Sequence, residues 1–280
     1  MKTAVITGST RGLGYEMAKD LRRYGLNVIL NGSNAERLEG AVNALKKIKG
    51  RGGVAGFCAD VGSAEEVRAL AAHAAERFGV VDIWINNAGV NQPMKAIWEL
   101  SDDEVDSLID IDLRGAVIGS RIAAELMESQ PQGGYIYNVE GYGSNDAMML
   151  GFNMYGTSKR AVTHFTVALA KELEERHSKV KAGRLSPGIV ATDFLTNALG
   201  GEQKIELPGK TKRFYNIVAE PPDVVAHFLV KSMLANRKNN VRINRLTNVR
   251  LLSRFITAGY NTIAIKDNSS TRSRATANTR

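Results

Sequence analysis

Short runs of β-branched and other apolar residues alternate with longer amphipathic segments along most of this chain. The runs have the length of strands, and the segments between them repeat apolar residues with the helical period. Such alternation is typical of βαβ units, whose strands are parallel and whose crossovers are right-handed. We therefore expect one doubly wound, Rossmann-type α/β domain with about seven mostly parallel strands and helices on both faces of the sheet.

The two periods also predict where the elements and the domain limits lie. Strands are expected at residues 3–7, 27–31, 54–59, 82–86, 134–139, 181–185 and 241–243. Helices are expected at residues 13–24, 35–48, 64–78, 101–129, 154–175 and 222–235. The domain should cover residues 1–266, with a mobile substrate lid at about 188–219. Residues 267–280 contain almost nothing apolar and are expected to form a disordered basic tail.

Composition and charge exclude several classes of protein. The formal net charge is +8, but much of the excess lies in residues 237–280, and no basic stripe interleaved with aromatic residues indicates a nucleic-acid surface. No apolar stretch approaches the roughly 20 residues of a membrane span, and the chain starts with a strand rather than a signal peptide. The single cysteine, Cys58, is expected to be buried and fits a reducing, cytoplasmic location. The four histidines lack the spacing of metal ligands, so no metal is expected.

A glycine-rich turn follows the first expected strand and is the first candidate binding site. It reads Thr7-Gly8-Ser9-Thr10-Arg11-Gly12-Leu13-Gly14. Glycines at this spacing allow a sharp turn, close approach of the main chain to a pyrophosphate, and close packing of helix on strand. The free N–H groups of the following helix then point at the phosphates. We predict that residues 8–14 bind a dinucleotide.

Two further strand ends carry residues that suit the same ligand. Asp60 and Val61 follow the third expected strand, where a carboxylate can accept a hydrogen bond from an adenine amine. Asn87-Ala88-Gly89 follows the fourth, where small residues let the main chain pass the adenosine ribose. Because ligands of doubly wound sheets bind at the carboxyl ends of the strands, the three sites should belong together.

The second expected strand indicates which dinucleotide is bound. NAD sites of this type place an acidic residue there to hold the ribose hydroxyls. This strand ends Asn31-Gly32-Ser33-Asn34, and the next carboxylate, Glu36, lies inside the following helix. Arg11 can pair with a 2′-phosphate, and Asn31 and Ser33 can add hydrogen bonds. We therefore predict NADP as the cofactor.

Tyr155 and Lys159 are the candidate catalytic pair. They lie four residues apart on an expected helix and so share one face. An unperturbed phenol has a pKa near ~10, but an adjacent ammonium and a positively charged nicotinamide would lower it. Tyr155 can then donate a proton to a carbonyl oxygen during reduction or accept one in the reverse reaction.

These motifs, in this order, resemble the short-chain dehydrogenase/reductase family over about residues 1–235. Ser186-Pro187-Gly188 and Thr192 also match the family pattern, which implies that Pro187, Gly188 and Thr192 contact the cofactor and that Thr192 binds the nicotinamide amide. The resemblance implies direct hydride transfer without metal, and a homodimer or homotetramer.

The sequence departs from the family at two catalytic positions. The family's serine is replaced within Asn138-Val139-Glu140-Gly141, so Ser144 is the nearest hydroxyl that can orient a carbonyl. Glu140 is a second candidate if burial keeps it protonated. Asp112 stands where the family has a relay asparagine; it can accept a hydrogen bond from water or Lys159, but its charge would oppose formation of the phenolate.

The altered segment looks like the Asn-x-Asp-Gly-x-Gly-Ser stretch of chlorophyll b reductases, which implies reduction of a formyl group with NADPH. A bulky apolar substrate would need an apolar cleft, expected to involve residues Met148, Met149, Leu150, Phe152, Phe194 and Leu195. The alternatives are a ketone or secondary-alcohol oxidoreductase acting on a steroid-like or acyl ketone, and a regulatory or assembly protein that binds NADP without turnover. Residues 246–260 mix basic and apolar side chains; packing on a partner subunit is favoured there over peripheral membrane contact.

Overall fold

Seven parallel strands form the centre of the described residues, 1–192 and 209–257, of this computed structural model. Their order is β3-β2-β1-β4-β5-β6-β7, so the sheet is wound outward from β1 in both directions. This confirms the predicted doubly wound sheet. The strands are β1 (Thr3–Ile6), β2 (Asn27–Gly32), β3 (Val54–Cys58), β4 (Ile83–Asn86), β5 (Gly134–Val139), β6 (Val180–Ser186) and β7 (Val241–Asn244).

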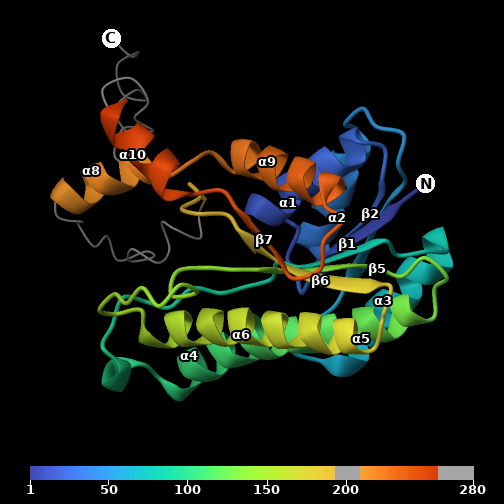
Figure 1. The fold of residues 1–280 in the computed structure, drawn as a ribbon, viewed down its shortest axis with the longest axis horizontal. Coiled ribbons are helices and arrows are strands. Elements are labelled where there is room, and N and C mark those ends of the chain that lie inside the picture. Colours follow the sequence, from blue (N-terminus) through green and yellow to red (C-terminus); the bar gives the residue numbers. More distant parts are fainter. Residues whose placement is uncertain (193–208, 258–280) are drawn as a thin grey trace, which may run out of the picture.

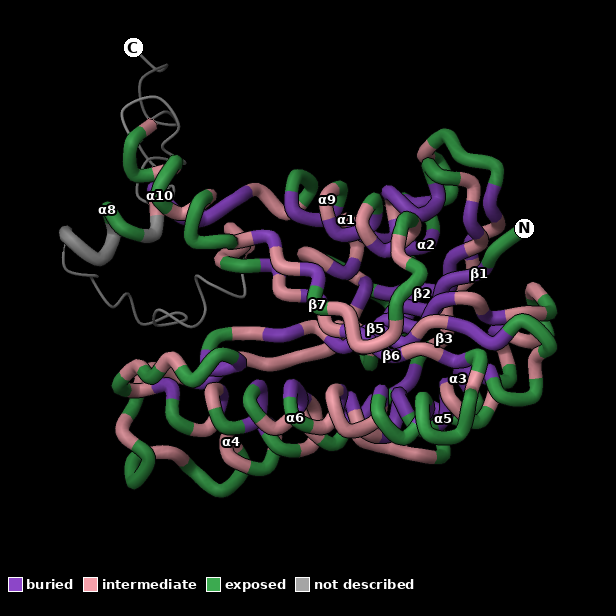
Figure 2. The backbone as a smooth tube through the Cα atoms, viewed as in Figure 1, coloured by how far each residue is buried: buried purple, intermediate pink, exposed green. Residues whose placement is uncertain are grey.

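Helices cover both faces of the sheet (Figure 1). One layer consists of α1 (Gly12–Arg23), α2 (Ala35–Lys46) and α9 (Pro222–Ala235), and the other of α3 (Ala64–Phe78), α5 (Gly115–Glu128) and α6 (Asn153–Glu175). Because strand side chains alternate, Ala4 and Ile6 of β1 pack into the first layer and Val5 packs into the second. Figure 2 shows that burial is concentrated along the sheet and the helix faces turned toward it.

Shorter elements lie around this frame and include one irregular turn. They are η1 (Ile97–Glu99), α4 (Asp102–Ser107), the π-helical η2 (Leu108–Arg114), α8 (Gly209–Val218) and α10 (Asn248–Ile256). The helix predicted at residues 101–129 is therefore three elements, because a π-helical segment with i→i+5 hydrogen bonds interrupts it between α4 and α5.

The structure also bears on the predicted lid, the predicted burial of Cys58 and the expected lack of a membrane span. Part of the predicted lid, residues 209–218, forms α8, whereas residues 193–208 and the predicted tail at 267–280 lie outside the described residues. The expected burial of Cys58 is wrong: the residue ends β3, an edge strand, and is exposed. Among the described residues, no helix is long and apolar enough to cross a bilayer.

A buried polar network joins the middle of the sheet to the second helix layer. The Asn138 Oδ1 on β5 accepts hydrogen bonds from Asn86 Nδ2 at 2.8 Å and Ser120 Oγ at 3.1 Å. The Asn138 Nδ2 donates to Thr166 Oγ1 on α6 at 2.9 Å. These bonds fix β5 against α6, the helix that carries the candidate catalytic pair Tyr155 and Lys159.

Replacing Asn138 with alanine should lower the free energy of unfolding by about 1–3 kcal/mol or more, because buried donors and acceptors would lose their partners. The same change at Asn145, which is exposed, is the matched control and should leave stability nearly unchanged. Chemical denaturation of both variants measures the difference. Equal midpoints would contradict a stabilising role for the network.

Candidate active site

The glycine-rich loop between β1 and α1 has the backbone that the sequence predicts. Gly8 and Gly12 both have φ of +59°, a left-handed conformation that favours glycine. A Cβ on Gly8 would lie 2.6 Å from Ala88 Cα, and one on Gly14 would lie 2.7 Å from the Gly8 carbonyl oxygen. The loop thus depends on glycine both for its turn and for its close packing.

The start of α1 is suited to hold an anion. Its N-cap residue, Arg11, has an extended backbone and an exposed side chain. Within the described structure, no side chain caps this helix end and no acidic residue lies in its first turn. The first N–H groups of α1 are therefore left for a ligand, and the helix dipole favours a phosphate there.

Thr192 lies over the same loop from the opposite half of the chain. A Cβ on Gly12 would lie 3.7 Å from the Thr192 methyl group. Thr192 follows Pro187 and Gly188 beyond the end of β6, and Gly188 has a φ of +76°. The structure thus brings together the loop and the segment that the family resemblance assigns to the cofactor.

Asn87 and Ala88 fasten the end of β4 to the loop. The Asn87 side-chain amide donates to the carbonyl oxygens of Thr7 and Gly8, at 3.0 and 2.9 Å. The main-chain N–H groups of Asn87 and Ala88 donate to Thr7 Oγ1 at 3.0 and 3.1 Å. These bonds hold the two strand ends at a fixed separation.

Asn31 and Ser9 are engaged within the protein. The buried Asn31 side chain accepts a hydrogen bond from the Gly8 N–H at 3.3 Å and donates to the Ala59 carbonyl at 2.9 Å. Ser9 Oγ donates to the Ile6 carbonyl and accepts from the Asn31 N–H. This geometry gives both side chains a role in shaping the loop, and contact with a 2′-phosphate stays a prediction for Asn31. Ser33, at the end of β2, is exposed, as is Arg11.

Asp60 lies in a surface hollow beyond the end of β3. Its Oδ1 accepts a hydrogen bond from the Gly62 N–H at 2.9 Å. The hollow has a volume of about 580 Å³ and is lined by Asp60, Gly62, Ser63, Ala64, Ser107, Asp110, Ile111 and Arg114. Val61 is buried beside it. A contact between Asp60 and the adenine of a cofactor stays a prediction.

Tyr155 and Lys159 lie on one face of α6 and are both buried. The Lys159 Nζ is 5.5 Å from the centre of the Tyr155 ring. The same Nζ forms an ion pair with Asp112 Oδ2 at 3.3 Å, while Asp112 Oδ1 accepts a hydrogen bond from the Val90 N–H at 2.7 Å. The structure therefore brings the side chains of Tyr155, Lys159 and Asp112 together, with the carboxylate paired directly with the lysine ammonium.

These surroundings raise the pKa of Tyr155, where the sequence predicts a lowered value. Burial of the phenol is the larger cause, and the negative charge of Asp112 is the second. Burial also raises the pKa of Asp112, although Lys159 and the Val90 N–H oppose this. In the absence of a charged ligand, Tyr155 is thus held firmly in its protonated form.

Gly141 occupies the position of the family's serine, and its missing side chain makes room for Tyr155. A Cβ there would lie 2.3 Å from the Tyr155 hydroxyl oxygen and 3.0 Å from Lys159 Cγ. Ser144, the predicted substitute, accepts a hydrogen bond from the Gly141 N–H at 3.2 Å and donates to the Lys159 carbonyl at 3.3 Å. Its hydroxyl is thus engaged by two main-chain groups, and its role in orienting a carbonyl stays a prediction.

Glu140 serves a different purpose from the one that the sequence suggests. Its Oε2 accepts a hydrogen bond from Arg242 Nε on β7 at 2.7 Å, and its Oε1 accepts from the Thr163 hydroxyl at 3.2 Å. This ion pair, in which Glu140 is buried and Arg242 is exposed, joins the end of β5 to β7, and the Thr163 contact joins it to α6. The placement therefore gives no support to Glu140 as a protonated donor to the substrate.

Gln92, which the sequence does not single out, positions α6. The buried Gln92 Oε1 accepts a hydrogen bond from the Tyr155 N–H at 3.0 Å and so satisfies a free donor in the first turn of α6. No motif or period distinguishes a lone glutamine in the loop after β4, so no sequence signal was available.

Apolar side chains pack around Tyr155 of the candidate catalytic pair. Phe152 packs edge-on against the Tyr155 ring at 6.1 Å between centroids, and Met149 packs against the same cluster. Met148 and Leu150 are almost fully exposed, whereas Phe194 and Leu195 lie outside the described residues. Within the described residues, no group of three His, Cys, Asp or Glu side chains is arranged to hold a metal ion.

The segment Ala88–Gly89 connects the two halves of the site. On one side, Ala88 packs on Gly8 of the phosphate loop. On the other, a Cβ on Gly89 would lie 3.0 Å from Asp112 Oδ1 and 3.3 Å from Lys159 Nζ. The glycine-rich loop and the Tyr155–Lys159 pair therefore lie on either side of the main chain of Ala88–Gly89.

Comparison with known proteins gives consistent similarities. The family model for short chain dehydrogenases matches residues 2–202. The chloroplastic chlorophyll(ide) b reductase NOL of Oryza sativa subsp. japonica is 38% identical over 257 residues, covering 90% of this chain and 73% of that protein. Its counterpart in Arabidopsis thaliana is 38% identical over 233 residues, covering 82% of this chain and 65% of that protein, so the chain spans just under two thirds of this relative. An alcohol dehydrogenase from the archaeon Thermococcus sibiricus, complexed with 5-hydroxy-NADP, is 26% identical with a TM-score of 0.71, covering 89% of this chain and 97% of that chain.

Proposed function

Because this chain belongs to the short-chain dehydrogenase/reductase family, we propose that it is an NADPH-dependent carbonyl reductase. Its substrate is an aldehyde or ketone on a bulky apolar molecule, and the formyl group of chlorophyll b or a related tetrapyrrole is the first candidate. The observation that carries the proposal is the contact of Ala88–Gly89 with both the phosphate loop and the Asp112–Lys159 pair. This arrangement supports a dinucleotide and a proton donor acting on one carbonyl.

Each residue of the site has a separate role in the proposed reduction. The nicotinamide cofactor supplies the hydride, and the N–H groups at the start of α1 hold its phosphates. Tyr155 donates its hydroxyl proton to the carbonyl oxygen. Its raised pKa means that this proton is present before the transfer. Lys159 lies beside the phenol and favours the phenolate left after the transfer. Asp112 fixes the position of the Lys159 ammonium.

Two features support a bulky apolar substrate. Phe152 and Met149 pack around Tyr155, and Met148 and Leu150 present exposed apolar side chains on the same connection between β5 and α6. The similarity to the rice and Arabidopsis chlorophyll(ide) b reductases supports the tetrapyrrole in particular.

A panel of carbonyl compounds followed by NADPH absorbance tests the reaction. Formyl-porphyrins should be reduced faster than steroid ketones or short aldehydes. Turnover confined to ketones would favour the ketone or secondary-alcohol oxidoreductase instead. Tight NADPH binding with no turnover on the whole panel would favour the regulatory or assembly protein.

The cofactor preference is expected to depend on Arg11. Changing Arg11 to glutamine should weaken NADPH binding by about ten- to hundredfold, because a hydrogen-bonded charge pair contributes roughly 1.5–3 kcal/mol. NADH binding should be unchanged, since NADH lacks the 2′-phosphate. Fluorescence titration measures both, with Arg51→Gln, another exposed arginine, as the control. Equal affinity of the wild type for both cofactors would contradict the assignment.

The oligomeric state and the cellular location of this protein are also parts of the proposal. We propose a homodimer or homotetramer, which sedimentation velocity of the purified chain would identify. The cytoplasmic location stays a prediction; the rice and Arabidopsis relatives are named as chloroplastic.

A further inference from the structure

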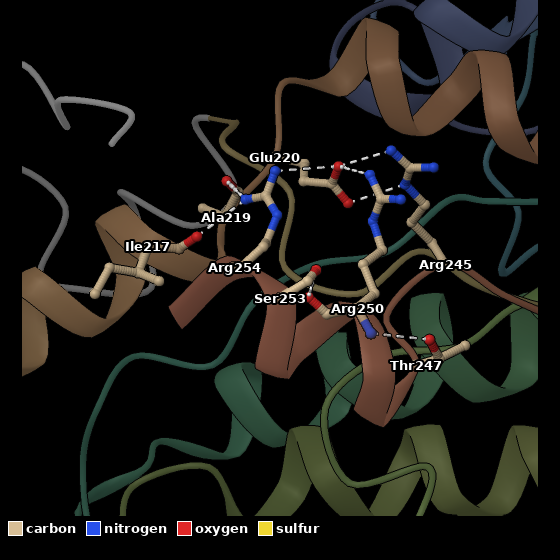
Figure 3. A network of polar contacts seen from close by, with 8 residues as sticks. All are labelled: Ile217, Ala219, Glu220, Arg245, Thr247, Arg250, Ser253 and Arg254. Carbon is tan, nitrogen blue, oxygen red and sulfur yellow. Dashed lines mark hydrogen bonds and ion pairs between the residues drawn. The ribbon is translucent and has the colours of Figure 1, made fainter. Parts of the chain in front are cut away.

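One buried carboxylate holds three arginines near the carboxyl end of the described chain (Figure 3). Glu220 accepts hydrogen bonds from Arg245 Nε at 2.9 Å and Nη2 at 2.7 Å, and from Arg250 Nη2 at 2.8 Å. Arg254 Nη2 lies 3.2 Å from the same carboxylate. Burial opposes the charge on Glu220, but the hydrogen bonds from the arginines hold its pKa below the usual value. The cluster therefore contains three positive charges and one negative charge.

The arginines attach α10 to the protein by its polar face. Arg250 and Arg254 belong to α10, and Arg254 Nη1 also donates to the carbonyl oxygens of Ile217 and Ala219. A surface helix ordinarily turns its apolar side inward and its charges to water. In α10 the charged side faces inward, so its apolar side is left outside.

The outer side of α10 is a continuous apolar strip. Its residues are Val249, Leu252, Phe255 and Ile256, which are 80%, 63%, 44% and 75% exposed. Phe214 of α8 extends the strip, since its ring lies 6.0 Å from that of Phe255. Contiguous exposed apolar patches commonly mark sites that bind another protein, a membrane or a ligand.

The charge around the strip is positive. In sequence, neither α8 nor α10 contains an acidic residue, and the exposed Arg213 lies next to Phe214. In sequence alone, residues 258–280 contain Lys266, Arg272, Arg274 and Arg280 against the single acid Asp267. An apolar helix face with basic surroundings is the combination that binds an anionic lipid surface.

We propose that α10, together with Phe214 and Arg213 of α8, docks this protein on an anionic lipid bilayer. The strip lies along a helix of nine residues, whereas a stable protein interface needs about 20–30 residues on each side. A bilayer needs no complementary partner surface, so a short helix suffices when basic charge assists it. This occupant replaces the partner subunit that the sequence favoured for residues 246–260.

The docking surface is tied to the candidate active site through Glu220. The Glu220 N–H donates to the Ile189 carbonyl, and the Ala191 N–H donates to the Glu220 carbonyl, both at 2.9 Å. Thr192, the residue directly after this pairing, lies over the phosphate loop. Docking would therefore bring the site close to apolar molecules held in the bilayer, a consequence that rests on the proposed function.

Co-sedimentation with vesicles tests the proposal without any enzymatic readout. The wild-type chain should bind vesicles of phosphatidylcholine containing about one third phosphatidylglycerol, and bind pure phosphatidylcholine at least about tenfold more weakly. The double variant Leu252→Asn with Ile256→Asn should lose about tenfold or more of this affinity, because two exposed apolar side chains no longer enter the bilayer. Val224→Asn, which alters an exposed apolar residue of α9, is the matched control and should bind as the wild type does.

Sedimentation velocity and NADPH titration of the same variants separate the outcomes. Unchanged oligomer size and unchanged NADPH affinity in the double variant, with lost vesicle binding, support docking on lipid. A wild type that ignores anionic vesicles overturns the proposal. A double variant that binds vesicles normally but dissociates into smaller oligomers also overturns it, and assigns the strip to a second copy of the chain. Vesicle binding without carbonyl turnover would leave docking established and refute only the proposed reaction.

Discussion

Replacing Tyr155 with phenylalanine is expected to lower kcat for carbonyl reduction by about a hundredfold to ten-thousandfold, the usual contribution of a positioned proton donor. The Kd for NADPH should remain unchanged, because the phosphate loop that holds the cofactor does not contain this residue. Tyr142→Phe is the matched control, since this tyrosine is exposed and lies one ring away from Tyr155, across Phe152. Stopped-flow or steady-state absorbance of NADPH measures the rates.

The pH dependence of the reduction rate is a second test of Tyr155 as the proton donor. The raised pKa of Tyr155 means that its proton is retained through the neutral range. Reduction should therefore proceed at a level rate through neutral pH and fall only in alkali, and the phenylalanine variant should lack that fall. A Phe variant with wild-type kcat would remove Tyr155 from the mechanism.

Installing the family's serine at position 141 is expected to lower activity rather than improve it. A Cβ at this position would lie 2.3 Å from the Tyr155 hydroxyl oxygen, which is too close for any side chain without movement of the phenol. A displacement of this kind in a catalytic group commonly costs about a hundredfold in rate. Gly141→Ser should thus lower kcat by at least about tenfold with a smaller change in the Kd for NADPH.

Gly40→Ser provides the matched control for this substitution. Gly40 lies on α2, and apart from its chain neighbours and the backbone of its own helix no described atom lies within 4 Å of where its Cβ would be. The added side chain therefore meets open space. Thermal unfolding of both variants separates a local displacement from a loss of fold. Higher activity in Gly141→Ser would show that the serine role can be restored and that the close packing of Tyr155 on Gly141 is dispensable.

The fold was predictable because its signals are local and repeat along the chain. The positions of all seven strands follow from short apolar runs, and α6 was predicted to within one residue at its start. The break at Leu108–Arg114 was not predictable, because the apolar pattern continues across it and only the hydrogen bonds change. The exposure of Cys58 was missed because the strand order, which makes β3 an edge, depends on long-range pairing.

The geometry of the candidate site was predictable where a motif requires a particular backbone conformation or helix spacing. Gly8, Gly12 and the Tyr155–Lys159 pair lie as their motifs require. Asn31 and Ser144 were harder, because amide and hydroxyl groups near a strand end bind main-chain atoms as readily as a ligand. The burial that raises the pKa of Tyr155 in the absence of cofactor was also missed, since burial is not visible in the sequence.

The π-helical segment that carries Asp112 decides which side chain meets Lys159. Successive residues of a helix project about 100° apart, so a change of one residue in the length of this turn would swing Asp112 away from the ammonium. A neighbouring side chain, the apolar Ile111 or Leu113, would then face the lysine. The charge near the Tyr155 phenol therefore depends on the length of this π-helical segment as well as on which residues it contains. Deleting one residue between Leu108 and Arg114, other than Asp112, would break the Asp112–Lys159 ion pair while leaving Tyr155, Lys159 and Asp112 in the chain.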